Sequence, residues 1–301
     1  QRAAFYRFSG STEPSVGTAE VLSGKALSYN NLVDLDAALA LAKEFDEPFA
    51  CVIKHTNPCG AAAAETLEAA LAEAWTGDPI SAFGSVLALT RPVNLACAEF
   101  LVSGNRFVEA IIAPAIDDDA FELLTKKPKW GKSVRLLACG DFSPAVRRAG
   151  EVELGKLVGG FLLQERDLPC EGADRFRVVT KTEPSAAQMA ELTFANKIAK
   201  HVKSNAIVLV AGQTVRGVGA GQMSRVDSVR LAVSKAGERA TGSVLASDAF
   251  FPFPDGVEAA IQAGVSAIVE PGGSIRDDQV IAACDAARIP MVFSDARHFR
   301  H

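Results

Sequence analysis

The chain has 301 residues, of which 49% are hydrophobic and 22% are charged, and its formal net charge is -5 at pH 7. This much apolar material supports a large buried core and argues against disorder. The net negative charge argues against a surface that binds nucleic acid through its phosphates.

No apolar run reaches the roughly 18 residues of a membrane span, and the first residues lack the layout of a secretory signal. Six cysteines stand singly without a C-x-x-C pair, as reduced thiols do. We therefore expect a cytoplasmic protein that contacts neither membrane nor nucleic acid.

Short apolar runs alternate with turns and Ala-rich stretches of helical spacing, which is the pattern of a layered α/β fold. In the first part of the chain this pattern predicts strands at 49–54, 85–89, 107–113 and 134–139, with helices at 65–75 and 117–126. The pattern loosens around Pro169 and Gly172. We place a boundary there, between a first α/β subdomain at 1–167 and a second at 168–301.

The second part of the chain repeats this alternation. It predicts helices at 185–202, 225–237, 255–263 and 277–287, and strands at 206–210, 214–219, 243–246, 267–270 and 291–293. Two series of similar length suggest a structural duplication, although the sequence has no fixed-period repeat.

The densest group of reactive side chains is Lys54–Gly60 (KHTNPCG), which begins at the last residue of the first predicted strand. Ligands of α/β sheets bind outside the carboxyl ends of strands. Histidine titrates near neutral pH, and a neighbouring ammonium favours its neutral, basic form. The pattern therefore indicates Lys54 and His55 as a catalytic pair. The alternative is a polar strand end without function.

Pro58 and Cys59 near His55 resemble part of a zinc deaminase motif. However, no Glu lies two residues after any His, and no second Cys lies three residues after Cys59. A zinc site would lack ligands. We therefore expect an enzyme without a divalent metal.

Three further clusters could bind a ligand. The glycine-rich stretch Gly217–Arg225 could hold an anion on its free amides, or it could be a tight turn capped by Ser224; it lacks the features of a P-loop or a dinucleotide fold. The loop Ser247–Gly256 has three phenylalanines that are either core or the walls of a pocket for a flat ring. The segment Arg297–His301 is either a solvated basic tail or a clamp on an anionic ligand.

Together and in this order, these motifs resemble the formyltransferase half of the bifunctional purine-biosynthesis enzymes that combine aminoimidazole-carboxamide ribonucleotide (AICAR) formyltransferase with IMP cyclohydrolase. Further motifs that carry the resemblance are DPISAFG, IIAP, KSNAIVLV and RHFRH. The resemblance implies transfer of the formyl group of 10-formyltetrahydrofolate to the 5-amino group of AICAR, giving formyl-AICAR and tetrahydrofolate. It also implies two cytidine-deaminase-like α/β subdomains without zinc and a homodimer with active sites at the interface, and it leaves a monovalent cation open.

The resemblance also implies roles for individual residues. His55 matches the family's base, Lys54 an active-site cation and Asn205 the residue that orients the formyl group. The remaining matches are binding residues for nucleotide or folate: Asn31, Phe83, Gly84, Glu109, Arg225, Phe250, Phe253, Asp255, Arg297 and Phe299.

The sequence begins at Gln1 rather than Met. We expect further residues before it, because the family has an Arg and a Tyr of the phosphate site upstream of this position, and before them the cyclohydrolase half. Two alternatives to an active formyltransferase therefore stay open. One is a fragment that binds ligand with little or no catalysis, and the other is a deaminase-like metal enzyme.

Overall fold

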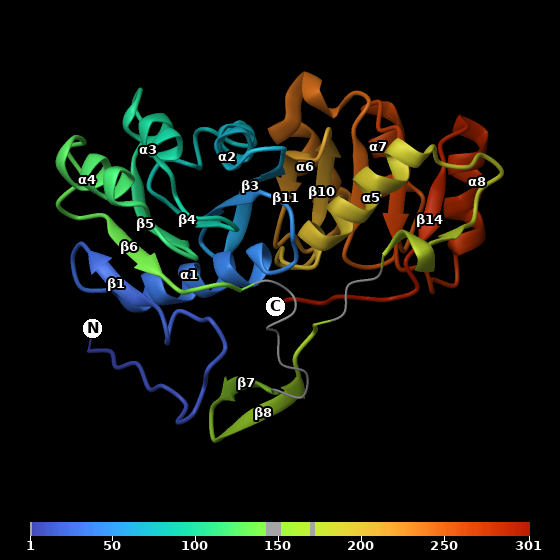
Figure 1. The fold of residues 1–301 in the computed structure, drawn as a ribbon. Helices are drawn as coiled ribbons and strands as arrows, with labels where there is room; N and C mark the ends of the chain where they lie inside the picture. The colour runs from blue at the N-terminus through green and yellow to red at the C-terminus, as the bar shows by residue number, and fades with distance from the viewer. Residues whose placement is uncertain (1, 143–151, 169–171) are drawn as a thin grey trace.

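The structure is a computed structural model that describes residues 2–142, 152–168 and 172–301. At its centre lies a mixed sheet of 12 strands with helices on both faces (Figure 1). The predicted α/β fold class is therefore confirmed. In the described residues, no helix is long and apolar enough to cross a membrane.

The first half of the molecule begins with an edge strand and a helix. In chain order its elements are β1 (Glu20–Ser23), α1 (Tyr29–Ala42), β2 (Phe49–Lys54), β3 (Asn57–Ala63), α2 (Leu67–Trp75), β4 (Ser85–Leu89), α3 (Leu95–Val102), β5 (Val108–Ala113), α4 (Asp118–Lys126) and β6 (Arg135–Ala138).

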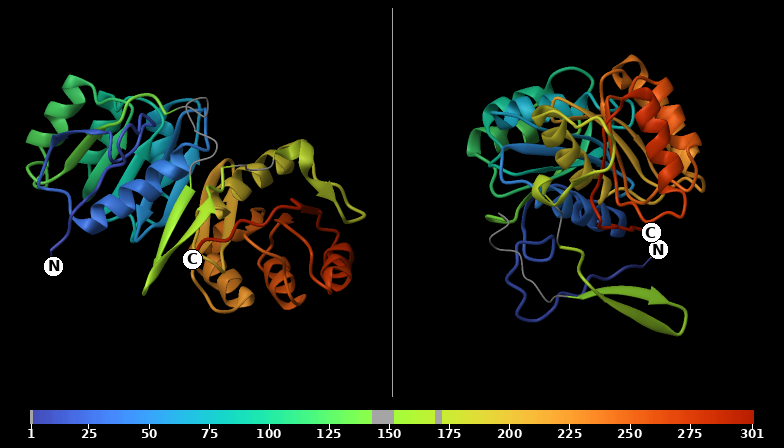
Figure 2. Two further views of the ribbon diagram at one scale, coloured as in Figure 1. Left: turned by 90° about the horizontal axis from the view of Figure 1, so that it is seen from below. Right: turned by 90° about the vertical axis from the view of Figure 1, so that its right-hand side faces the viewer.

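The second half follows the same order of strands and helices. Its elements are β9 (Arg177–Val178), α5 (Ala186–Ala199), β10 (Ile207–Ala211), β11 (Thr214–Gly219), α6 (Arg225–Ala236), β12 (Val244–Ser247), α7 (Asp255–Gln262), β13 (Ala267–Glu270), α8 (Asp277–Ala287) and β14 (Met291–Phe293). Between the halves lies a separate hairpin of β7 (Val152–Leu157) and β8 (Gly160–Glu165), which projects away from the sheet (Figures 1 and 2).

The strand order is β1-β6-β5-β4-β2-β3-β11-β10-β12-β13-β14-β9. It is a palindrome, because each strand of one half has its counterpart at the mirrored position in the other. β3 and β11 join the halves antiparallel, with Ala62 opposite Thr214. The structure thus shows the duplication that the sequence only suggested. The predicted boundary at 167/168 falls in the connection between the halves.

Three layers follow from the alternation of side chains along the strands. On β2, Cys51 and Ile53 pack into one core with α1 and α5, whereas Ala50 and Val52 pack on the opposite face with α2 and α3. The helices α6, α7 and α8 cover that same face in the second half. The central core beneath α1 and α5 is continuous across both halves, so the two halves share one scaffold.

The predicted strands 49–54, 85–89, 214–219, 267–270 and 291–293 are confirmed residue for residue. The predicted helix at 65–75 begins later, because Thr66 is its N-cap and accepts a hydrogen bond from the backbone N–H of Ala69. The elements that the sequence did not predict are β1, α1, β3, α3, β7, β8 and β9.

Candidate active site

The predicted catalytic pair lies where β2 ends, with Lys54 as the last residue of the strand and His55 as the first residue of the turn. This turn is a two-residue hairpin loop, His55-Thr56, in which φ is 53° and 63°. Such loops favour Asn-Gly because both residues adopt left-handed backbone, which is strained for a β-branched residue. The backbone N–H of Thr56 donates to Asp34 Oδ1 of α1 at 2.8 Å and holds the turn in place. His55 itself is exposed.

Lys54 is held against the loop that precedes β4. Its ammonium donates to the carbonyl oxygens of Phe83 at 3.0 Å and Gly84 at 2.8 Å. The ring of Phe83 stands edge-on against Phe107, with 5.5 Å between centroids, and is half exposed. The structure thus brings together three of the predicted residues: Lys54, Phe83 and Gly84.

Asn31 and Glu109 form a pair of their own. The Asn31 side-chain amide donates to Glu109 Oε2 at 2.9 Å. Asn31 Oδ1 accepts from the backbone N–H and the hydroxyl of Ser28, which completes a capping box at the start of α1. Asn31 is buried and both ends of its amide have partners within the chain, so its side chain has a structural task in addition to the predicted one.

Most of the other predicted residues line one cavity in the second half. Its volume is about 430 Å³, and seven of them line it: Asn205, Arg225, Phe250, Phe253, Asp255, Arg297 and Phe299. Phe251 is instead fully buried in the core beneath the loop. The three-phenylalanine loop therefore divides between the two roles that the sequence left open.

Cations lie over the aromatic faces of this cavity. The guanidinium carbon of Arg276 is 4.2 Å from the centroid of the Phe253 ring, and that of Arg297 is 4.7 Å from the Phe299 ring. Phe253 is 49% exposed. Exposed rings that carry guanidinium groups suit a ligand that is both flat and anionic.

A buried ion pair supports this cavity from behind. Arg225 is paired with Asp248, and both side chains are buried. Asp248 also accepts hydrogen bonds from the backbone N–H of Ala206 at 2.9 Å and the hydroxyl of Ser204 at 2.5 Å. The Asn205 amide donates to the carbonyl of Gln222 at 2.7 Å. Arg225 is thus fixed by Asp248 and contributes one edge of the cavity.

Lys54 and His55 line a separate cavity of about 280 Å³, together with Asn57. The two cavities are neighbours, because Asn57 Oδ1 accepts a hydrogen bond from the backbone N–H of Lys203 at 2.9 Å. Lys203 lies two residues before Asn205, which lines the larger cavity. The predicted residues around these two cavities therefore form two adjoining groups, and Asn31 with Glu109 forms a third.

Comparisons with known proteins show the family of the chain. A family model described as "AICARFT/IMPCHase bienzyme" matches residues 1–235. The chain therefore belongs to the AICARFT/IMPCHase family. It is 50% identical over 301 residues to a protein of Rhodopirellula baltica, and 52% identical over 305 residues to one of Sorangium cellulosum. Both relatives are named "Bifunctional purine biosynthesis protein PurH". Each match covers all of this chain and 57% of the relative, so the chain spans little more than half of their length.

For this member of the family, the structure also shows what the glycine-rich stretch does. Gly219 lies on β11 against α6, where a Cβ atom would come 1.9 Å from the carbonyl oxygen of Ser228. The hydroxyl of Ser224 caps α6 by accepting from the backbone N–H of Asp227 at 3.2 Å. The stretch is therefore a close strand–helix contact followed by a capped turn, as one of its two interpretations had it.

Asp248 entered the sequence predictions only as a member of the loop Ser247–Gly256, without a role of its own, and Glu270 was not singled out. Both are acids at the end of an apolar strand, and this position is the sequence feature that could have identified them. Glu270 Oε2 accepts the backbone N–H of Phe251 at 2.6 Å, and its Oε1 has no hydrogen-bond partner among the described residues. Burial raises the pKa of Glu270 to about 8, so this carboxyl group is largely neutral at neutral pH.

Of the thiols in the described residues, Cys59 lines the cavity of Lys54 and His55. Cys51, Cys97, Cys139 and Cys284 are buried and Cys59 is partly so, and burial raises the pKa of each to about 12. Cys170 lies outside the described residues. Within those residues, no three His, Cys, Asp or Glu side chains are grouped to hold a metal ion.

Proposed function

We propose that this chain carries the formyltransferase site of its family and transfers the formyl group of 10-formyltetrahydrofolate to the 5-amino group of AICAR. The single observation that carries the proposal is the aromatic and cationic cavity of Asn205, Phe250, Phe253 and Arg297 next to the Lys54–His55 turn. One group offers a base and a cation, and the other offers faces for flat rings.

In the proposed reaction the amine of AICAR attacks the formyl carbon. A new C–N bond forms, the bond from the formyl carbon to the folate nitrogen breaks, and a proton moves from the amine to the folate nitrogen. This amine is a poor nucleophile because its lone pair is conjugated with the imidazole, so a base that removes its proton during attack has a large effect. His55 is that base in our proposal. The Lys54 ammonium stabilises negative charge that develops on the formyl oxygen.

The larger cavity would hold the flat ring of the folate. A volume of about 430 Å³ falls within the range of small-molecule sites. Phe250 and Phe253 offer ring faces, and Asp255 at the first turn of α7 offers a carboxylate to ring N–H groups. The Asn205 amide orients the formyl group, and its own position is fixed by Gln222.

The test is a formyl-transfer assay that follows tetrahydrofolate production by absorbance. Removal of one positioned base lowers turnover by roughly 100- to 10,000-fold, so we expect this loss in His55→Ala. The matched control is Gln213→Ala in the equivalent turn of the second half, which should keep normal turnover. The assay is run on this chain and on a protein of the length of its relatives.

Two outcomes would contradict the proposal. Near-normal turnover of His55→Ala would exclude His55 as the base. Binding of AICAR by both proteins without any turnover would favour a ligand-binding role instead.

We also propose that the chain acts as a homodimer, and the β7–β8 hairpin supports this. The pairing register places Val152, Leu154, Phe161 and Leu163 on one face of the hairpin and Leu157 and Leu162 on the other, and all six are exposed. A two-stranded hairpin is at best marginally stable alone. Exposed apolar side chains on both of its faces are typical of a surface that another protein surface covers. Near its base lies a cavity of about 550 Å³ lined by Phe5, Tyr6 and Phe8, which offers a second copy an apolar surface.

Sedimentation equilibrium tests the dimer. The parent chain should sediment as a dimer, and Leu154→Glu with Leu163→Glu should sediment as a monomer. Val21→Glu, an exposed apolar position on the distant edge strand β1, serves as the control and should stay dimeric. A parent chain that is monomeric at micromolar concentration would contradict this proposal.

A further inference from the structure

The last five residues, Arg297–His301, alternate between two environments. Arg297, Phe299 and His301 are exposed, whereas His298 is buried and Arg300 is partly buried. The exposed three stack on one another: Arg297 lies over the Phe299 ring, and the rings of Phe299 and His301 are 5.3 Å apart at an interplanar angle of 23°. Such alternation is that of extended chain, whose successive side chains point to opposite sides.

The segment runs from β14 back toward the first half of the molecule (Figure 1). Its exposed side faces the cavity of the proposed folate site, which Arg297 and Phe299 line. Its other side faces a cluster of charged residues between α1, α5 and the end of the β7–β8 hairpin. Each of the two inward residues has a specific partner there.

His298 is the first anchor. It is 7% exposed, and its Nδ1 lies 2.8 Å from Asp167 Oδ2. An ionised carboxylate only accepts hydrogen bonds, so Nδ1 is the nitrogen that carries the proton. The pKa of Asp167 is lowered by this hydrogen bond and by nearby positive charges, although burial opposes the shift.

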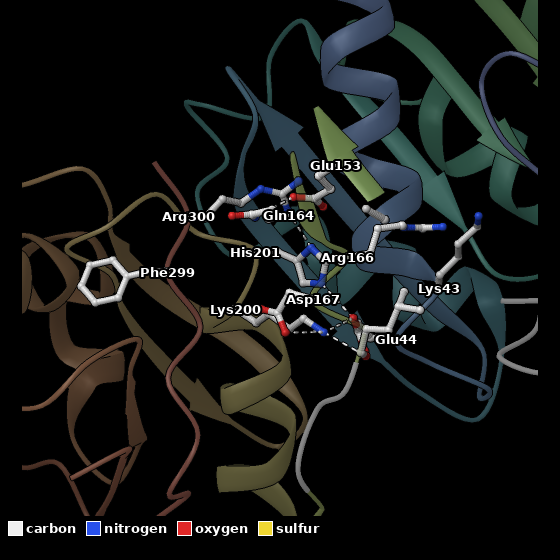
Figure 3. A pocket seen from close by; sticks show the side chains of 12 residues that line it. Lys43, Glu44, Glu153, Gln164, Arg166, Asp167, Lys200, His201, Phe299 and Arg300 are labelled. Carbon is white, nitrogen blue, oxygen red and sulfur yellow. Dashed lines mark hydrogen bonds and ion pairs between the residues drawn. The ribbon is translucent and has the colours of Figure 1, made fainter. Parts of the chain in front are cut away.

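Arg300 is the second anchor, and its contact fixes the state of His201. The Arg300 guanidinium lies 3.0 Å from His201 Nδ1. A guanidinium only donates, so His201 Nδ1 is the acceptor and its proton is on Nε2. That Nε2 lies 3.1 Å from Glu44 Oε1, which also receives the Lys200 ammonium at 3.1 Å. Figure 3 shows His201 between Arg300 and Glu44, with the Phe299 ring pointing away from the cluster.

The neutral His201 thus links the buried carboxylate of Glu44 to Arg300 of the segment through two hydrogen bonds. Burial lowers the pKa of His201 to about 4, in agreement with this neutral form. The backbone of Arg300 reaches further, because its carbonyl accepts the backbone N–H of Ser204 at 2.9 Å. Ser204 precedes Asn205, so the segment also holds the loop that presents Asn205 to the cavity.

We propose that His298 and Arg300 are positioning residues, which hold Arg297, Phe299 and Asn205 at the cavity through Asp167 and through His201 and Glu44. The inference rests on the proposed function for what the cavity binds. The anchors themselves touch no substrate. Their loss should therefore weaken ligand binding far more than it slows the chemical step.

The test compares two variants of His201 in this chain. His201→Leu keeps the volume and removes both hydrogen bonds. His201→Gln restores an acceptor for Arg300 and a donor for Glu44. Asp167→Ala removes the other anchor at a partly exposed position that should not impair folding. Thr90→Val is the control. The hydroxyl of buried Thr90 accepts from the N–H of Phe49 and donates to the carbonyl of Glu47, both at 2.8 Å, and neither hydrogen bond involves the segment.

The first readout needs no activity. Trypsin cleaves after Arg297 when the segment detaches, and mass spectrometry follows the loss of the last four residues. We expect cleavage about tenfold faster or more in His201→Leu and Asp167→Ala than in the parent, with His201→Gln and Thr90→Val close to the parent. Equal rates in His201→Leu and Thr90→Val would overturn the anchoring.

The second readout is steady-state kinetics of formyl transfer. We expect KM to rise about 10- to 100-fold in His201→Leu and Asp167→Ala with kcat within about threefold, and His201→Gln to restore KM. Faster cleavage with unchanged KM would overturn the positioning role. If neither the parent nor a protein of the length of its relatives shows turnover, the proposed function fails, and the proteolysis result still decides whether the segment is anchored as we infer.

Discussion

The hairpin turns of the two halves have the same backbone and different residues. In the first half His55-Thr56 has φ values of 53° and 63°, and in the second half Gly212-Gln213 has values of 61° and 57°. Both connect equivalent strands by two residues. The second-half turn has a glycine at one strained position, and the first-half turn has none. A turn that has no glycine at its strained positions and presents an exposed His supports the proposal that its residues serve chemistry rather than stability.

The halves also differ in which strand ends meet the site. Ile53 of β2 lies opposite Val86, near the beginning of β4, whereas Ile207 of β10 lies opposite Ser247 at the end of β12. Because the halves meet antiparallel, one edge of the sheet collects the starts of β4 and β5 and the ends of β12 and β13. The rule that ligands bind outside the carboxyl ends of parallel strands therefore describes the second half only.

The largest effect should come from exchanging the turns. The double change His55→Asn with Thr56→Gly gives the first half the preferred turn sequence. We expect turnover to fall by roughly 100- to 10,000-fold through loss of the base. We expect the free energy of unfolding to rise by about 1 to 2 kcal/mol through relief of strain. A formyl-transfer assay and urea unfolding measure the two changes.

The control applies the same exchange to the other half. Gly212→Asn with Gln213→Gly should leave turnover unchanged and alter stability by less than about 0.5 kcal/mol. If the first-half exchange destabilised the protein, the turn would be selected for stability, and the contrast between the halves would disappear.

The next effect is a loss of stability at the close strand–helix contact that both halves share. Gly60 packs against α2 and Gly219 against α6, and a Cβ atom at either would come 1.9 Å from a helix carbonyl oxygen. We expect Gly60→Ala and Gly219→Ala each to cost about 3 kcal/mol or more, because backbone must move in both cases. Gly242→Ala, where no atom lies within 4 Å, is the control and should cost about 1 kcal/mol for its positive φ alone. A marginal loss in one half only would show that its helix can shift where the other cannot.

The parts of the fold that the sequence predicted are those where burial determines the pattern. Runs such as Phe49–Lys54 and Ser85–Leu89 are apolar at nearly every position because both faces are covered. β3 was missed because Asn57-Pro58-Cys59-Gly60 has the composition of a turn, although it pairs along β2. The edge strands β1 and β9 were missed because none of their side chains is buried, so burial imposes no apolar pattern on them.

The predicted site residues came from sequence motifs, whereas the residues that support them could be identified only from the three-dimensional structure. Lys54 and His55 could be singled out by their position at the end of a strand. His201 could not, since its partners Glu44 and Arg300 lie 157 and 99 residues away in the sequence. Spacing along the chain has no information on contacts of this length, which the fold alone creates.

A medium effect on the free energy of unfolding, which depends on pH, distinguishes the two halves. The strand β13 ends on buried Glu270, whereas its counterpart β5 ends on Ala113. Burial raises the pKa of Glu270 from an ordinary 4.5 to about 8. The folded protein therefore keeps a proton that the unfolded chain loses above pH 4.5, so stability falls as pH rises from about 4.5 to 8.

Glu270→Gln replaces the neutral acid by a neutral amide and should remove this fall. We expect the variant to gain about 3 kcal/mol relative to the parent between pH 5 and pH 8, measured by urea unfolding at both values. Glu258→Gln, on the exposed side of α7, controls for loss of one carboxylate. A parent and variant with parallel pH profiles would show that Glu270 is ionised throughout.

The smallest effect uses the equivalent caps of α2 and α6. Thr66 accepts the backbone N–H of Ala69 at 3.3 Å, and Ser224 accepts that of Asp227 at 3.2 Å. Loss of either cap should cost about 1 kcal/mol, so Thr66→Ala and Ser224→Ala should have similar unfolding midpoints. Only Ser224 lines the aromatic cavity. Calorimetric titration with folate should therefore show weaker binding in Ser224→Ala alone. An equal loss of affinity in Thr66→Ala would contradict the division of the site into a base in the first half and an aromatic wall in the second.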